Sequence, residues 1–377
     1  MQIYLSEEQE MILETVRDLV NEKIKPKARY YDETGEFPHQ NIDSLKEIGI
    51  LGMNIEEKYG GINANILTYA VVLEEISRGC ASTATTIAGS NSLAATPIQK
   101  YGNDYIKETF LPLLTTHLGA FGLSESHAGS DAAALSTRAI RDGDEFVING
   151  SKTFITNAEQ AKIVVLFARS LDIPGYKGIS AFVVPTETEG FNILPHEKKM
   201  GIRASATNAL SFEELRIPKE NIIGEEGKGL NIALSTLNSG RIAVAAQSVG
   251  IAQAAYEAGL KYAKEREQFG KSISNYQSIQ MMLAEMTTKI TYSRLLYYHA
   301  AKLHDAGLPY IKEAAMAKWV GSETATFCAH RAIQIHGGNG YINEFEVERL
   351  YRDARITEIY EGTSEIMQMI ISREELK

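Results

Sequence analysis

Glu145-Phe146-Val147-Ile148-Asn149-Gly150-Ser151-Lys152-Thr153-Phe154-Ile155-Thr156 lies between two long helical regions and decides the fold. Its β-branched and aromatic residues are typical of strands. Asn-Gly between two such runs is a strong hairpin signal, because both turn residues adopt positive φ. We therefore predict a β-hairpin that turns at Asn149-Gly150. Further strands are expected at 163–168, 179–185 and 209–217, separated by glycine and proline as in a small barrel or sandwich.

On both sides of this region the apolar spacing becomes that of helices. Ser6 and Gln9 predict a capping box at the first helix. More helices are expected at 43–48, 66–78, 230–265, 276–304 and 311–335, and after Thr363. The pattern predicts an α+β fold with an N-terminal helical domain at 1–118, a middle small β-barrel or sandwich domain at 119–225, and a C-terminal helical bundle at 226–377. Because βαβ units are missing, it disfavours a doubly wound sheet.

Composition restricts the class of protein. The 377 residues are 44% hydrophobic and 23% charged, which is typical of a soluble globular chain. The net charge of −10 argues against a general nucleic-acid binder. Cys80 and Cys328 are too few for a disulfide framework and indicate thiols in a reducing compartment, so a cytoplasmic location is expected. The sequence has no run of about 18 consecutive apolar residues, so we expect no membrane-spanning helix.

Several common motifs fail. Gly270-Lys271-Ser272 resembles the end of a phosphate-binding loop, but Glu265 occupies the position of the first glycine. Gly337-Gly338-Asn339-Gly340 has the wrong spacing for a dinucleotide fingerprint. Histidines and cysteines are scattered along the chain, so we expect no metal site.

Four separate stretches carry residues suited to bind a flat, polar ring and a diphosphate. The loop 121–131 is rich in glycine and serine, and Phe154 with Thr156 places an aromatic ring and a hydroxyl on one strand face. Arg266 and Phe269 could bind a diphosphate and stack on an adenine. The fourth stretch combines 334–340 with 360–366, where Glu361 precedes a helix start. Taken alone, each stretch is more often an ordinary loop, strand or helix end.

Together, in type, order and separation, the four stretches resemble the acyl-CoA dehydrogenase family over essentially the whole chain. The resemblance implies a three-domain flavoprotein that uses FAD, usually forms a homotetramer and passes electrons to an electron-transferring flavoprotein. It implies that Glu361 removes the α-proton of an acyl-CoA thioester while the β-hydrogen leaves as hydride to the flavin. Exclusion of water on binding of the acyl chain should raise the pKa of Glu361.

The resemblance also implies the remaining site residues. Arg266, Gln268 and Phe269 would contact the FAD of a neighbouring subunit, and Gln277 with the turn 334–338 would complete that pocket. The cofactor-binding set is Phe121, Leu123, Ser124, Ser130, Phe154, Thr156, Arg266, Gln268, Phe269, Gln277, Gln334, Gly337, Gly338, Thr363 and Glu365. The substrate-binding set is Ser130, Asn238, Arg241 and Gly362.

Three positions depart from the family pattern. Ser126-His127 stands where a proline is usual, Phe154 replaces a tryptophan, and Asn238 replaces an aspartate near the expected CoA site. The last change keeps a carrier-protein thioester open as an alternative substrate. An oxidase that uses oxygen and a non-catalytic thioester-binding scaffold are further alternatives.

The acyl group is the least determined part of the prediction. By resemblance the segment 91–96 lines the acyl pocket, where Ala94 and Ala95 leave volume. No arginine occurs between Arg78 and Arg138, which disfavours a dicarboxylic acyl chain. A short- to medium-chain acyl group, linear, branched or cyclic, is therefore expected.

Overall fold

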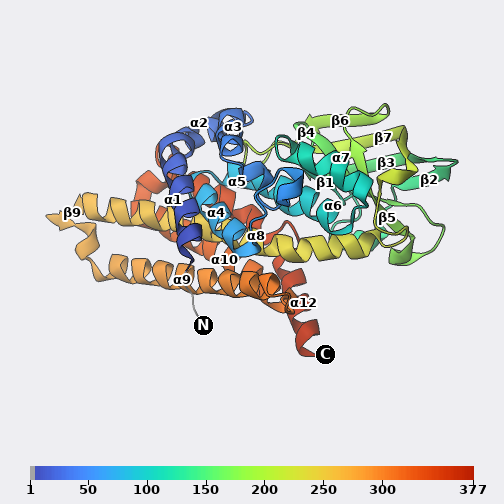
Figure 1. Ribbon diagram of the computed structural model, residues 1–377. Coiled ribbons are helices and arrows are strands. Elements are labelled where there is room, and N and C mark those ends of the chain that lie inside the picture. The colour runs from blue at the N-terminus through green and yellow to red at the C-terminus, as the bar shows by residue number, and fades with distance from the viewer. Residues whose placement is uncertain (1–4) are drawn as a thin grey trace.

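The computed structural model describes residues 5–377, in which a β-sheet lies between two groups of helices in the chain order (Figure 1). The α+β class and the order helices, sheet, helices are confirmed. Among the described residues, every helix is too short or too polar to cross a membrane.

The N-terminal helices are α1 (Glu7–Leu19), α2 (Ala28–Thr34), α3 (His39–Glu47), α4 (Ile66–Gly79), α5 (Ala81–Ala88), α6 (Thr96–Tyr101) and α7 (Asp104–Leu114). Three of the N-terminal helices, α1, α4 and α7, begin at side-chain caps. Ser6 accepts a hydrogen bond from the backbone N–H of Gln9 at 3.2 Å, and the Gln9 side chain accepts one from the Ser6 N–H at 2.9 Å, which is the predicted capping box. Asn65 and Asn103 cap α4 and α7, each side chain accepting one backbone N–H without the reciprocal bond of a capping box. A π-helical segment, Gly89–Ala95, continues α5.

The middle part is an eight-stranded sheet folded into two packed halves. Its strand order is β6-β7-β3-β2-β4-β5-β8, and β1 pairs with β4 in parallel. β2 joins β4 at a single residue pair. Phe146 of one half contacts Phe182 of the other, with ring centroids 4.9 Å apart. Both rings belong to a buried hydrophobic cluster to which both halves of the sheet contribute residues. The strands are β1 (Leu118–Gly122), β2 (Arg138–Asp142), β3 (Glu145–Thr156), β4 (Ala161–Arg169), β5 (Ile179–Pro185), β6 (Phe191–His196), β7 (Thr207–Pro218) and β8 (Ile222–Ile223).

The predicted hairpin at Asn149-Gly150 is wrong, because β3 runs through both residues. The Asn149 side chain donates to Glu214 Oε1 at 2.8 Å and accepts from the Glu214 N–H at 2.9 Å. Asn149 therefore forms cross-strand hydrogen bonds to β7 and does not form a turn. Gly150 lies at a register shift, where a Cβ would come within 2.8 Å of the Thr137 backbone. The turn lies instead at Gly143, whose φ is +62°, between the paired ends of β2 and β3.

The C-terminal part is built around one long helix. α8 (Gly229–Glu265) has 37 residues and spans about 55 Å at 1.5 Å per residue. It runs from the sheet to the small hairpin of β9 (Glu267–Gln268) and β10 (Lys271–Ser272) at the opposite end of the molecule (Figure 1). The other elements are α9 (Gln277–Asp305), α10 (Ile311–His336), α11 (Val347–Arg355) and α12 (Ser364–Glu375).

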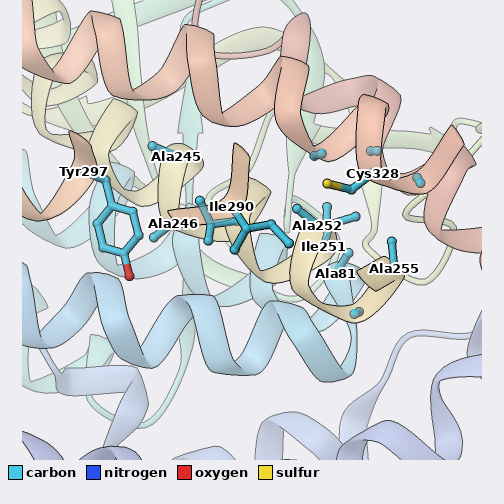
Figure 2. Close-up of a cluster of buried hydrophobic side chains, with 14 of the residues drawn as sticks. Ala81, Ala245, Ala246, Ile251, Ala252, Ala255, Ile290, Tyr297 and Cys328 are labelled. Carbon is cyan, nitrogen blue, oxygen red and sulfur yellow. The ribbon is translucent and has the colours of Figure 1, made fainter. Parts of the chain in front are cut away.

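Small side chains bring these helices together. Ala245, Ala246, Ala252 and Ala255 of α8 are fully buried in one cluster with residues of α9 and α10 (Figure 2). Alanine adds little bulk to a helix surface, so neighbouring backbones approach closely at such positions. The packing holds α8 between α4 on one side and α9 with α10 on the other, and thereby fixes the residues at both of its ends.

Candidate active site

Glu361 lies in a turn with an unusual backbone, between α11 and α12. Its φ is +52°, and that of Gly362 is +104°. A positive φ is uncommon for a residue other than glycine and indicates that the surroundings impose it. Thr363 then caps α12, its Oγ1 accepting a hydrogen bond from the Ile366 N–H at 3.4 Å, and the helix begins after Thr363, as the sequence predicted.

The Glu361 carboxylate is directed at α8. Its Oε2 is buried and has no hydrogen-bond partner among the described residues. A Cβ at Gly240 would overlap this oxygen and would come within 3.3 Å of Leu93 Cδ2, so the three residues meet at one point. Burial raises the pKa of Glu361 to about 7, against the opposing positive charges of Arg241 and Lys318. The carboxylate is therefore poised to gain or lose a proton near neutral pH.

Asn238 and Arg241 lie one turn apart on α8 and contact each other, as their spacing predicts. Arg241 Nη1 donates to Asn238 Oδ1 at 2.5 Å, whereas Arg241 Nε is buried without a partner in residues 5–377. Burial lowers the pKa of this guanidinium to about 10, and the negative charge of Glu361 opposes that shift. The pair thus lies within electrostatic reach of the base candidate.

Two buried groups beside the turn were missed by the sequence analysis. Lys318 of α10 donates from Nζ to the Gly362 carbonyl at 2.5 Å. The Tyr360 hydroxyl donates to Gln247 Oε1 at 2.6 Å. A lysine among the alanines of one face of α10 was the available signal, and it does not show what the lysine contacts.

The glycine- and serine-rich loop after β1 is held by an ion pair that sequence reasoning also missed. Glu125 Oε1 accepts from Lys152 Nζ at 2.7 Å, with both side chains buried. Glu125 also accepts from the backbone N–H and hydroxyl groups of Ser136 and Thr137. Burial alone would raise the pKa of Glu125, but Lys152 and these hydrogen bonds lower it to about 2. Lys152 Nζ further donates to the Leu123 carbonyl, so the ion pair fixes the loop backbone.

The loop and β3 present groups that fit a flavin. The hydroxyls of Ser124, Ser130 and Thr156 make no hydrogen bond to other described residues. Phe154 is 68% exposed and lies at a register shift of β3 with φ +58°. The Thr153 N–H donates to the Ser124 carbonyl at 2.9 Å, which places this part of β3 against the loop. Unpaired hydroxyls beside an exposed aromatic ring suit the polar edge and the flat face of an isoalloxazine ring.

The remaining sequence-predicted cofactor residues gather at the other end of α8. Arg266, Gln268 and Phe269 lie on the exposed β9–β10 hairpin, and Phe269 is 95% exposed with φ +52°. The turn 334–340 packs against the same end of α8, because His336 stacks on Tyr262 with centroids 4.1 Å apart. One chain therefore does not bring this group together with Glu361 (Figure 1).

Three family models match the chain in the order of its three parts. They describe the N-terminal domain of acyl-CoA dehydrogenase at residues 6–117, its middle domain at 120–215 and its C-terminal domain at 227–376. The chain belongs to the acyl-CoA dehydrogenase family. Acyl-CoA dehydrogenase activity and an FAD cofactor follow for this chain, since its family relatives are FAD-dependent flavoproteins.

Individual relatives are similar over nearly their whole length. The short-chain specific mitochondrial acyl-CoA dehydrogenase of Homo sapiens is 46% identical over 98% of this chain and 90% of its own. The structure of butyryl-CoA dehydrogenase from Megasphaera elsdenii has a TM-score of 0.98 at 42% identity and full coverage of both chains. A chain from a study of the electron transferring flavoprotein of Acidaminococcus fermentans also has a TM-score of 0.98, at 43% identity and full coverage of both chains.

Proposed function

We propose that the protein oxidises a short- to medium-chain acyl-CoA thioester, linear, branched or cyclic, to the trans-2-enoyl-CoA, with Glu361 as the base that removes the α-proton. The observation that carries this proposal is Glu361 Oε2, which is buried, has no hydrogen-bond partner within residues 5–377 and is directed at Gly240. A carboxylate with a pKa of about 7 is a far stronger base than an exposed glutamate. When bound, FAD accepts the hydride that leaves the β-carbon.

The residues around Glu361 divide the remaining tasks. Asn238 and Arg241 of α8 would contact the CoA part of the substrate, and Ser130 and the Gly362 backbone would contact the thioester. The hydroxyls of Ser124 and Thr156 and the ring of Phe154 would hold the isoalloxazine ring of FAD, and Thr363 and Glu365 would make a further contact with FAD. Positioning the α-carbon against Glu361 is the main contribution of this framework to the rate.

Leu93 is proposed to limit the length of the acyl chain. Ala94 and Ala95 are buried in the core, and a Cβ at Gly119 would collide with the Cβ of Ala94, so these alanines do not leave free volume beside Glu361. Leu93 is the one residue of Gly89–Ala95 that is not fully buried, and it lies next to Glu361. Its bulk and the short-chain relatives together favour an acyl chain of about four carbons.

An oligomer is proposed because Arg266, Gln268 and Phe269 follow the end of α8, about 38 Å along the helix from Gly240, where Glu361 lies. The family resemblance makes this oligomer a homotetramer, in which these residues, with Gln277 and the turn 334–338, serve a second chain. They would complete the FAD site of a neighbouring subunit. An electron-transferring flavoprotein is the proposed electron acceptor, which is supported by the structural likeness to a chain studied together with such a protein.

An anaerobic titration tests the proposed substrate class. Purified protein is mixed with acyl-CoA thioesters of four to ten carbons, including branched and cyclic ones, while the visible flavin spectrum is recorded. We expect the butyryl thioester to bleach the flavin fastest, and Leu93→Ala to shift the preference to longer chains. Bleaching by no CoA ester, but by the same acyl group on a carrier protein, would replace CoA with the carrier-bound substrate that Asn238 keeps open.

A further inference from the structure

Lys318 is a buried cation without an ion-pair partner in residues 5–377. It belongs to α10, and its side chain is fully buried. Among the residues that the structure describes, no carboxylate comes within 4.0 Å of its Nζ, whose one recorded partner is the Gly362 carbonyl at 2.5 Å. Burying an ammonium group costs several kcal/mol unless its surroundings compensate. A leucine or methionine would fill such a position of an apolar helix at no such cost, so stability does not explain a lysine here.

The carbonyl that Lys318 holds belongs to the turn that carries the base candidate. Glu361 and Gly362 both have positive φ, and the peptide group between Gly362 and Thr363 must point its oxygen back toward α10. Thr363 is the N-cap of α12, and its side chain accepts a hydrogen bond from the Ile366 N–H. The turn is thus held on its C-terminal side by a helix cap and through its carbonyl by Lys318. Loss of the second contact would free the backbone next to Glu361.

The charge of Lys318 acts on the same carboxylate. The groups that face Glu361 are Lys318 from α10, Arg241 from α8, Tyr69 from α4 and the neighbouring Tyr360. Those that face Lys318 are Glu361, Arg241, Glu358 and Glu365. Burial lowers the pKa of Lys318 to about 8, so it is charged at neutral pH. Both cations favour the ionised form of Glu361 and oppose the effect of burial on it.

We propose that Lys318 is a positioning residue for the base: it holds the Gly362 carbonyl, keeps the Glu361 carboxylate over Gly240 and supports its ionised form. The proposal rests on the proposed function, in which Glu361 removes the α-proton. In this proposal Lys318 acts through the turn and through Glu361, by its contact with the Gly362 carbonyl.

The test compares Lys318→Met, which removes the charge and the donor at similar volume, with Lys318→Arg, which keeps both. The rate of anaerobic flavin reduction by butyryl-CoA is measured at saturating substrate from pH 5 to 9, with FAD content and melting temperature as checks on folding. We expect Lys318→Met to slow reduction by about 10- to 100-fold, as loss of a hydrogen bond from a charged group predicts, with a smaller change in KM. Its acid limb should move to higher pH, because a positive charge near Glu361 is lost. Lys318→Arg should keep the acid limb of the parent.

Lys312→Met serves as the matched control. Lys312 lies on the same helix but pairs with Glu375 at the surface, so its loss should leave rate and pH profile unchanged. An unchanged acid limb in Lys318→Met overturns the proposal, even when the rate falls. If that variant does not retain FAD, Lys318→Gln is measured with the same two outcomes. Glu361→Gln is measured in parallel. Full activity of Glu361→Gln would contradict the assignment of Glu361 as the base. If Glu361→Gln is inactive but Lys318→Met has the pH profile of the parent, only the role of Lys318 is contradicted.

Discussion

The Glu361 carboxylate lies against Gly240 so closely that a Cβ at position 240 would overlap its Oε2. The two residues are 121 positions apart in the chain and come together because α8 passes beneath the turn before α12. Glycine at position 240 therefore provides the space in which the carboxylate sits. It is also a helix-interior glycine, which costs about 0.5–1 kcal/mol relative to alanine.

Gly240→Ala should displace the carboxylate and slow flavin reduction by about 100-fold, a loss typical of a misplaced catalytic group. The rate is measured by stopped-flow mixing with butyryl-CoA. Gly259→Ala is the control, since Gly259 lies on the same helix and its added Cβ would meet the flexible end of Ile335 at 3.3 Å and otherwise only Ala332 at ordinary contact distances of 3.8 and 3.9 Å. Equal rates in the two variants would show that the space above Gly240 is not needed by the base.

The pH dependence follows from the raised pKa of Glu361. A base works in its ionised form, and Glu361 ionises as the pH rises through about 7. We therefore expect kcat/KM to increase with pH and to level off above an inflection near 7. The profile is recorded from pH 5 to 9 with FAD content checked at each point. A flat profile between pH 5 and 8 would contradict a buried, titrating carboxylate.

The ion pair between Glu125 and Lys152, which holds the glycine- and serine-rich loop after β1, should contribute strongly to the free energy of unfolding. Lys152→Met leaves the buried Glu125 carboxylate without its cation, which we expect to reduce the free energy of unfolding by about 3–5 kcal/mol. It should also weaken FAD retention, because Lys152 holds the Leu123 carbonyl. Urea unfolding and the ratio of flavin to protein absorbance measure the two effects. Lys162→Met, which breaks an exposed ion pair to Glu187, should change neither, and equal behaviour of the two variants would refute the special role of Lys152.

Subunit mixing tests whether the β9–β10 hairpin serves a neighbouring site. Arg266→Ala lacks the hairpin cation and Glu361→Gln lacks the base, so each variant alone should be inactive. When the two are co-expressed, some sites combine an intact Glu361 from one chain with an intact Arg266 from the other, and activity should return to about a quarter of the parent or more, depending on how subunits pair. Mixed oligomers without any recovered activity would mean that both residues act within the same chain.

The sequence predicted the elements of the fold better than their connections. The long helices and the strands β4, β5 and β7 were expected within a few residues, since their apolar spacing reports burial directly. The turn at Asn149-Gly150 was misplaced, because an Asn-Gly pair also suits a β-bulge when a partner strand offers Glu214. Local sequence does not reveal a cross-strand partner 65 residues away.

The candidate site likewise contains residues that the sequence predicted and residues that it did not. Glu361, Asn238 and Arg241 were expected, and the structure brings all three within electrostatic reach of one another. Lys318, Gly240 and the pair Glu125–Lys152 were not, because each acts through a contact between segments far apart in the chain. The role proposed for Leu93 also depended on knowing that Ala94 is buried in the core.

The central claim is that Glu361 removes the proton whose loss allows the flavin to be reduced. Its most direct test is anaerobic addition of butyryl-CoA to the parent protein and to Glu361→Gln, which keeps the size of the side chain. We predict that the parent bleaches, whereas the variant keeps its bound, yellow FAD and does not bleach. Bleaching of Glu361→Gln at the rate of the parent would contradict the account.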